Sequence, residues 1–129
     1  MAEPGQGFYP YQAGIDGYGN GGFRFAQMSH RGSLLCLPTG MHKWEVAAPA
    51  EITLESLGPV FDAADRIDVL LVGLGKDIAG FPKPIREALR ERGIIVEAIA
   101  TGGAVRTYNI LLGEDRAVGA ALIAVDSIK

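Results

Sequence analysis

Hydrophobic residues follow two different patterns along the chain, and the change comes partway through it. In the first part, turn-forming glycines separate short apolar segments, and residues 23–26 alternate apolar with polar side chains as a half-buried strand does. Two further strands are predicted over Ser33–Leu37, which Pro38 ends, and over residues 41–46. We expect these strands to form one small antiparallel layer, with Trp44 covering one end of the core.

The second part of the chain is predicted to alternate between helices and strands. A helix is expected after Thr53, a good N-cap, with an interruption at Gly58 and Pro59. A nearly continuous apolar run over residues 67–72 is typical of a central strand buried on both faces. The remaining predicted elements are a helix after Pro84 that ends at Gly93, a buried strand over residues 94–99, a helix that begins at Thr101 and a final strand over residues 118–125. This order predicts a right-handed βαβ unit and leaves the direction of the final strand open.

The first fourteen residues differ in composition from the rest, because they hold two prolines, three glycines and two tyrosines in a short polar stretch. Such a segment cannot support a core of its own. We therefore expect a flexible N-terminal arm over residues 1–14 and a single α/β domain over residues 15–129. An alternative is that this arm docks on a partner through Phe8, Tyr9 and Tyr11.

Composition narrows the classes of partner and compartment. The 129 residues carry 12 Lys and Arg against 15 Asp and Glu, a net charge of −3, without a basic cluster longer than a pair. This balance argues against nucleic acid as a partner. The apolar runs are far shorter than the roughly 20 residues of a membrane span, and the start does not resemble a signal peptide, so we expect a cytoplasmic protein without transmembrane insertion. Cys36 is the only cysteine and lies among leucines, which predicts a buried, reduced thiol.

Two strand ends could together form a ligand crevice. Gly73, Gly75 and Lys76 follow the first buried strand, while Thr101, Gly102 and Gly103 follow the second and open a helix that also carries Arg106 and Thr107. In open α/β sheets, ligands bind beyond the carboxyl ends of strands, where helix N-termini present free amides. This crevice could hold a small anion. The dinucleotide fingerprint and the Walker pattern are both incomplete here. Two alternatives therefore remain: the glycines serve only the geometry of the turns, or the crevice is a nucleotide site.

Residues suited to catalysis are few. His30 and His42 lie in polar surroundings without a third His or Cys at metal-ligand spacing, and we expect both at the surface. Ser33 lacks the surrounding glycines of a nucleophile elbow. The sequence therefore predicts no catalytic group, no metal site and no cofactor.

Asn109 is the polar exception in the last predicted helix. It stands next to Ile110 and Leu111, where a buried amide would need hydrogen-bond partners. We expect it to tie the helix to the loop after the first buried strand, and a ligand contact is the alternative.

Several motifs, in the same order along the chain, resemble the small uncharacterised-domain family that includes mitochondrial respiratory complex I assembly factor 3 and has a Mth938-type domain. They are Ile15-Asp16-Gly17-Tyr18, Gly22-Phe23, Leu35-x-Leu37-Pro38, Trp44, Ile52-Thr53-x-Glu55-Ser56, Val72-Gly73-Leu74-Gly75, Gly93-Ile94-Ile95-Val96-Glu97, Thr101-x-x-Ala104-x-x-Thr107-Tyr108-Asn109-x-Leu111 and Arg116-x-Val118-x-Ala120-Ala121-Leu122-Ile123. The resemblance covers about residues 15–125.

The resemblance implies a three-layer α/β domain in which a central mixed sheet has helices on one side and additional antiparallel β structure on the other. It also implies no established enzymatic activity. Members of this family act as assembly or regulatory partners, and the mitochondrial ones help to build the membrane-associated arm of complex I with a second assembly factor. We therefore expect a non-catalytic binding or assembly protein whose partner is a protein, for example a subunit or assembly factor of a membrane complex. The alternative is a protein that binds a small anion or nucleotide, or a weak enzyme, that uses the crevice.

Overall fold

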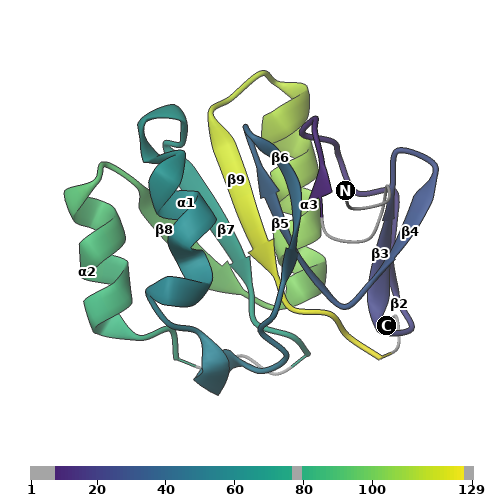
Figure 1. The fold of residues 1–129 in the computed structure, drawn as a ribbon, viewed down its shortest axis with the longest axis horizontal. Coiled ribbons are helices and arrows are strands. Elements are labelled where there is room, and N and C mark those ends of the chain that lie inside the picture. The colour runs from purple at the N-terminus through teal and green to yellow at the C-terminus, as the bar shows by residue number, and fades with distance from the viewer. Residues whose placement is uncertain (1–7, 77–79, 127–129) are drawn as a thin grey trace.

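The computed structural model describes residues 8–76 and 80–126, and a six-stranded mixed sheet forms its centre (Figure 1). The strands lie in the order β1-β6-β5-β9-β7-β8. Their bounds are β1 Phe8–Tyr9, β5 Ser33–Leu37, β6 Gly40–Trp44, β7 Val69–Gly73, β8 Ile95–Ile99 and β9 Val118–Leu122. The final strand β9 runs parallel to β7 and antiparallel to β5, which resolves the direction that the sequence left open.

Burial along the strands follows their place in the sheet. All residues of β5 and β9 are buried, and so is β7 after its first residue, as the apolar run predicts for a central strand. The expectation for residues 94–99 is wrong, because β8 is an edge strand in which Ile95 is 66% exposed. A short apolar run shows that a strand is present but not whether a neighbour covers both of its sides.

A second sheet of three antiparallel strands packs on the central one. Its strands are β2 Gly17–Gly19, β3 Gly22–Phe25 and β4 Met28–Arg31, joined in that order. Of the three strands that we expected in one separate layer, only the first belongs here. The other two are β5 and β6, which join the central sheet because β5 pairs with β9, for example Leu34 with Leu122.

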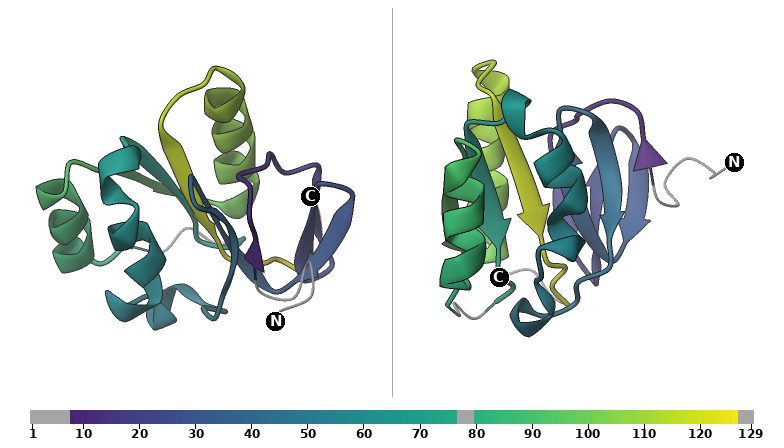
Figure 2. Two further views of the ribbon diagram at one scale, coloured as in Figure 1. Left: turned by 45° about the horizontal axis from the view of Figure 1, so that its top comes forward. Right: turned by 60° about the vertical axis from the view of Figure 1, so that its left-hand side comes forward.

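Helices cover both faces of the central sheet. On one face lie α1 Gly58–Asp62 and α2 Lys83–Glu91, with the short 3₁₀ turns Pro49–Glu51, Glu55–Leu57 and Ala64–Arg66. On the other face, α3 Thr101–Gly113 lies beside the three-stranded sheet (Figures 1 and 2). Each face has its own hydrophobic cluster: Val60, Leu70 and Leu89 belong to the first, and Phe25 and Tyr108 to the second.

The mixed α/β single-domain fold class is therefore confirmed, with one difference in the placement of helices. The helix α3 shares its side of the central sheet with the additional β structure, whereas we expected all helices on the other side. The reason lies in α3 itself: Ala104, Val105 and Tyr108 are buried in the same cluster as Phe23 and Phe25 of the small sheet. Hydrophobic periodicity gives the buried stripe of a helix but not the face of the sheet that it covers.

The described part of the expected N-terminal arm lies against the domain. Phe8 and Tyr9 form β1, which pairs antiparallel with β6. The ring of Tyr9 contacts that of Phe25 at 5.9 Å between centroids, and Gln12 Nε2 donates a hydrogen bond of 2.8 Å to the Val118 carbonyl oxygen. From Phe8 onward this segment is thus part of the packed domain, and residues 1–7 lie outside the described residues.

Candidate functional site

Thr101 is the central residue of the predicted crevice, and it is fully buried. Its Oγ1 donates a hydrogen bond of 2.7 Å to the Ile123 carbonyl oxygen and accepts one of 2.9 Å from the Gly75 amide. The Thr101 amide in turn donates to the Gly75 carbonyl oxygen at 2.9 Å. The hydroxyl expected to face a ligand therefore joins the ends of β7 and β9 to the start of α3.

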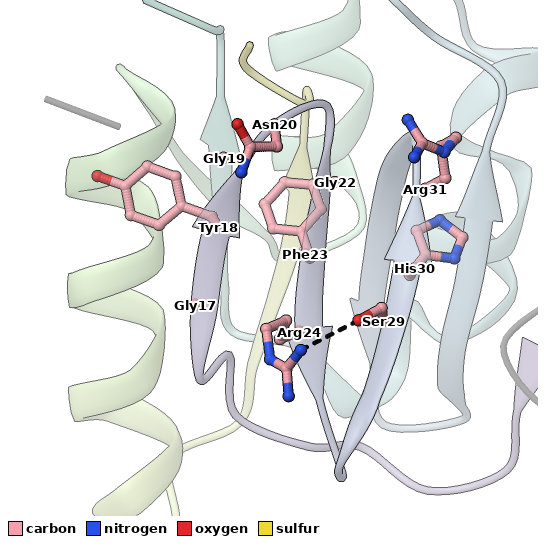
Figure 3. A pocket seen from close by; sticks show the side chains of 10 residues that line it. All are labelled: Gly17, Tyr18, Gly19, Asn20, Gly22, Phe23, Arg24, Ser29, His30 and Arg31. Carbon is pink, nitrogen blue, oxygen red and sulfur yellow. Dashed lines mark hydrogen bonds between the residues drawn. The ribbon is translucent and has the colours of Figure 1, made fainter. Parts of the chain in front are cut away.

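The glycines of this turn allow parts of the chain to approach closely. A Cβ atom on Gly73 would lie 2.9 Å from both Cα and Oγ1 of Thr101, closer than real Cβ atoms come. A Cβ atom on Gly102 would collide with the hydroxyl of Tyr18, which points from β2 toward α3 (Figure 3). On Gly103 it would lie 3.2 Å from Cδ1 of Ile99. Close packing thus accounts for glycine at these positions without a phosphate group.

The two cations of the predicted crevice do not line a common hollow. Lys76 and Arg106 are both exposed. A hollow of about 420 Å³ lies beside Gly75 and Lys76, and the chain after β9 and residues 47–49 form its other walls. Neither Thr101 nor Arg106 lines it. Thr107 is half-buried on α3. The structure therefore places Gly75 and Lys76 at a hollow that Arg106 does not reach, and Thr101 binds Gly75 from within the fold rather than facing that hollow.

Asn109 holds the N-terminal segment against α3. Its Oδ1 accepts a hydrogen bond from the Ile15 amide, and its Nδ2 donates one to the Ile15 carbonyl oxygen, both at 2.8 Å. One helical position earlier, the Tyr108 hydroxyl donates to the Ala13 carbonyl oxygen at 2.7 Å. Asn109 ties the helix to Ile15 and not to the loop after β7, because tertiary packing brings residues 94 positions apart into contact.

Burial favours the neutral forms of two ionisable side chains in the core, Cys36 and Tyr108. Burial raises the pKa of the Cys36 thiol far above its usual range, and burial likewise raises the pKa of the Tyr108 hydroxyl next to it. The expectation that His30 lies at the surface is wrong, since the residue is 4% exposed and its Nε2 lies 3.0 Å from the Ser33 carbonyl oxygen. His42 is half-buried, and desolvation lowers its pKa. Within residues 8–76 and 80–126, no group of three or more His, Cys, Asp or Glu side chains is arranged so that it could hold a metal ion.

Sequence reasoning overlooked the outer surface of the three-stranded sheet, where a hollow of about 470 Å³ opens. Arg24 and Arg31 lie on its neighbouring strands β3 and β4, and Nη1 of Arg24 donates a hydrogen bond of 3.3 Å to Oγ of Ser29 (Figure 3). We call the surface formed by the following residues the arginine face: Gly17, Gly19, Gly22, Arg24, Ser29 and Arg31. The strand alternation around Arg24 could have located it, because every second side chain of a half-buried strand faces outward.

The amino-acid sequence matches a protein family and is similar to individual proteins from other organisms. Residues 15–123 match the family described as protein of unknown function, DUF498/DUF598. An uncharacterised protein of Rhodobacter capsulatus is 40% identical over 109 residues, which cover 84% of this chain and 82% of that protein. NADH dehydrogenase [ubiquinone] 1 alpha subcomplex assembly factor 3 of Mus musculus is 34% identical over 118 residues, which cover 92% of this chain and 64% of the assembly factor.

Solved structures confirm the fold. A crystal structure of an outer membrane protein from Bartonella henselae has a TM-score of 0.88 and 47% identity, and the match covers 92% of this chain and 99% of that one. The solution structure of a Mth938-like domain from Bordetella pertussis has a TM-score of 0.75 and 26% identity, covering 99% and 94% of the two chains. In the described parts of this chain, every helix is too short or too polar to cross a membrane.

Proposed function

Because the chain belongs to the DUF498/DUF598 family, we propose that it is a non-catalytic assembly protein that binds a protein partner while a membrane-associated respiratory NADH dehydrogenase is built. The observation that carries the proposal is the similarity to the mouse assembly factor, which extends over 92% of this chain. The shared region is therefore nearly the whole domain and not one motif within it. The match covers 64% of the mouse protein, so the proposal concerns what this shared domain does.

The geometry supports a protein partner over a small ligand. At the strand ends where α/β proteins bind ligands, the Thr101 hydroxyl and the Gly75 amide are already bonded to each other. Large apolar side chains are instead exposed at several places on the surface. They are Phe8, Tyr11, Leu54, Ile95 and Ile110. Aromatic side chains such as Phe8 and Tyr11 are enriched in the buried parts of protein interfaces.

The proposal includes a location. Assembly of such a complex would take place at the membrane surface, and we propose that this chain acts there from the cytoplasmic side as a transient partner.

Deletion of the gene in the source organism tests the function. We expect less fully assembled NADH dehydrogenase on native gels and lower NADH oxidation by membranes, and both should return when the chain is supplied from a plasmid. A second respiratory complex in the same membranes is the internal control and should keep its normal amount. Normal assembly of the NADH dehydrogenase in the deletion strain would contradict the proposal.

A further inference from the structure

The arginine face presents two guanidinium groups on one side of the three-stranded sheet. Arg24 pairs with Ser29, and Gly22 pairs with Arg31, so Arg24 and Arg31 are diagonal neighbours on β3 and β4. Both arginines are exposed, while Phe23, Phe25 and His30, which alternate with them, are buried on the inner side. Diagonal neighbours across antiparallel strands are about 7–8 Å apart. The sheet thus sets the spacing of the two backbone positions from which these side chains extend.

Gly17 leaves the surface beside Arg24 open, whereas a Cβ atom on Gly22 would collide with the His30 carbonyl oxygen. Gly17 and Gly19 of β2 pair with Arg24 and Gly22, so three of the positions that share this side of the sheet have no side chain. The Arg24 side chain uses this space, because its Cδ lies 3.9 Å from the place of a Cβ atom on Gly17. The hollow has a volume of about 470 Å³, and three glycines and both arginines are among the residues that line it (Figure 3). Another extended chain could therefore come close to the sheet.

Within the described parts of the chain, carboxylates do not pair with the charges of this surface. Among the described residues, the single ion pair within 4.0 Å is that between Lys43 and Glu45, so neither Arg24 nor Arg31 is paired with a carboxylate there. Two aspartates flank this region of the chain: Asp16 precedes Gly17, and the Asp126 carbonyl oxygen accepts a hydrogen bond from the Asn20 amide. The whole chain carries a net charge of −3, so two close cations stand out against an acidic protein.

We propose that the arginine face binds an extended acidic segment of the partner protein, with Asp or Glu at alternate positions. Alternate residues of an extended chain lie roughly 6.6 Å apart, which is close to the spacing of diagonal neighbours on the sheet. Each guanidinium can bind one carboxylate through two parallel hydrogen bonds. The partner's charge is thus complementary to this face. The inference rests on the proposed function only in taking the partner to be a protein.

The test uses the purified full chain and a fluorescently labelled six-residue peptide of alternating Glu and Ser, with a peptide of alternating Gln and Ser as its neutral control. Binding is measured by fluorescence anisotropy at low and at physiological salt. Amide NMR shifts of Gly17, Gly19 and Gly22 report where the peptide binds. We expect the acidic peptide to bind more weakly at higher salt and to shift these glycine signals.

Two double variants with the same charge change separate the site from the overall charge. Arg24→Gln with Arg31→Gln should weaken binding by about tenfold or more, because both charge-assisted contacts are lost. Arg90→Gln with Arg116→Gln removes two exposed arginines from other parts of the chain and should leave binding within about twofold. Thermal melts of both variants should match the unmodified chain, since all four side chains are exposed.

Three outcomes would overturn the inference: equal losses in the two variants, no binding at low salt, or displacement of the peptide by inorganic phosphate at an equal concentration of charge. The last result would make the face a site for free anions. The deletion experiment is independent of these measurements. A failed peptide test would leave the assembly function standing, and normal assembly in the deletion strain would leave peptide binding to be explained by another partner.

Discussion

At the first turn of α3, glycine lets two parts of the chain touch, whereas Gly17 on the arginine face leaves space that only the Arg24 side chain approaches. Gly73 faces the backbone of Thr101 so closely that a Cβ atom could not be inserted. Gly17 has only the Arg24 Cδ at 3.9 Å from the position of its missing Cβ. The first arrangement uses its polar groups to hold the fold together, and the second leaves its charged groups available to a partner. Glycine-rich segments in one small domain can therefore have opposite physical meanings.

The largest expected effect comes from Thr101→Val, which keeps the shape of the side chain but removes its hydroxyl. The Gly75 amide and the Ile123 carbonyl oxygen would lose their partner at a buried position. We expect a loss of about 2 to 4 kcal/mol in the free energy of unfolding, measured by urea denaturation. Thr107→Val, the same change at a half-buried position of the same helix, is the control and should cost less than about 0.5 kcal/mol. Equal costs would show that the turn is not held by this hydroxyl.

A pair of alanine substitutions tests the two roles of glycine directly. Gly73→Ala should destabilise the domain by about 1 to 3 kcal/mol, because its methyl group would press on the Thr101 backbone. Gly17→Ala places its methyl group in ordinary contact with Arg24 and should change stability by less than about 1 kcal/mol. Both values follow from the same urea titrations. If the two variants lost the same stability, the contrast between a packed and an open glycine would be wrong.

The smallest expected effect is the response of the α3 turn to anions. Thermal melts with phosphate, nucleotides and small carboxylates should show no shift, and Lys76→Gln with Arg106→Gln should behave in the same way, since these cations do not line a common hollow. A ligand at about 100 times its dissociation constant would add about 2.7 kcal/mol of stability, which a melt detects easily. A reproducible shift that the double variant abolishes would restore the crevice as a ligand site.

Local patterns predicted the second half of the chain well. The apolar run that became β7 and the stripe of α3 with Ala104 and Tyr108 have a short period that can be read along the sequence. The helix α2 ends before Gly93 because this glycine adopts a positive φ of 85°. The polar role of Asn109 was also recognisable, because an amide next to buried positions needs partners.

Several errors of sequence reasoning concern tertiary contacts, and one is local, because α1 begins at Gly58 and Pro59 instead of being interrupted there. The partner of Asn109 was wrong because Ile15 lies on a segment that the sequence separates from α3 by most of the chain. The exposure of His30 was wrong because Ser33 and the packed small sheet enclose a residue whose sequence neighbours are polar. The arginine face was overlooked because it requires the register of β2, β3 and β4 at once.

The sequence by itself determined the kinds of element, their order from β7 to β9 and the absence of a second cysteine for any disulfide within the chain, since each depends on neighbouring residues or on composition. Only the tertiary structure decided that β5 pairs with β9 and that α3 shares a face of the central sheet with the small sheet. It also decided that the Thr101 hydroxyl forms its hydrogen bonds within the fold. The physical reason is that hydrophobic periodicity is local, whereas strand pairing and hydrogen-bond satisfaction depend on which distant surfaces meet.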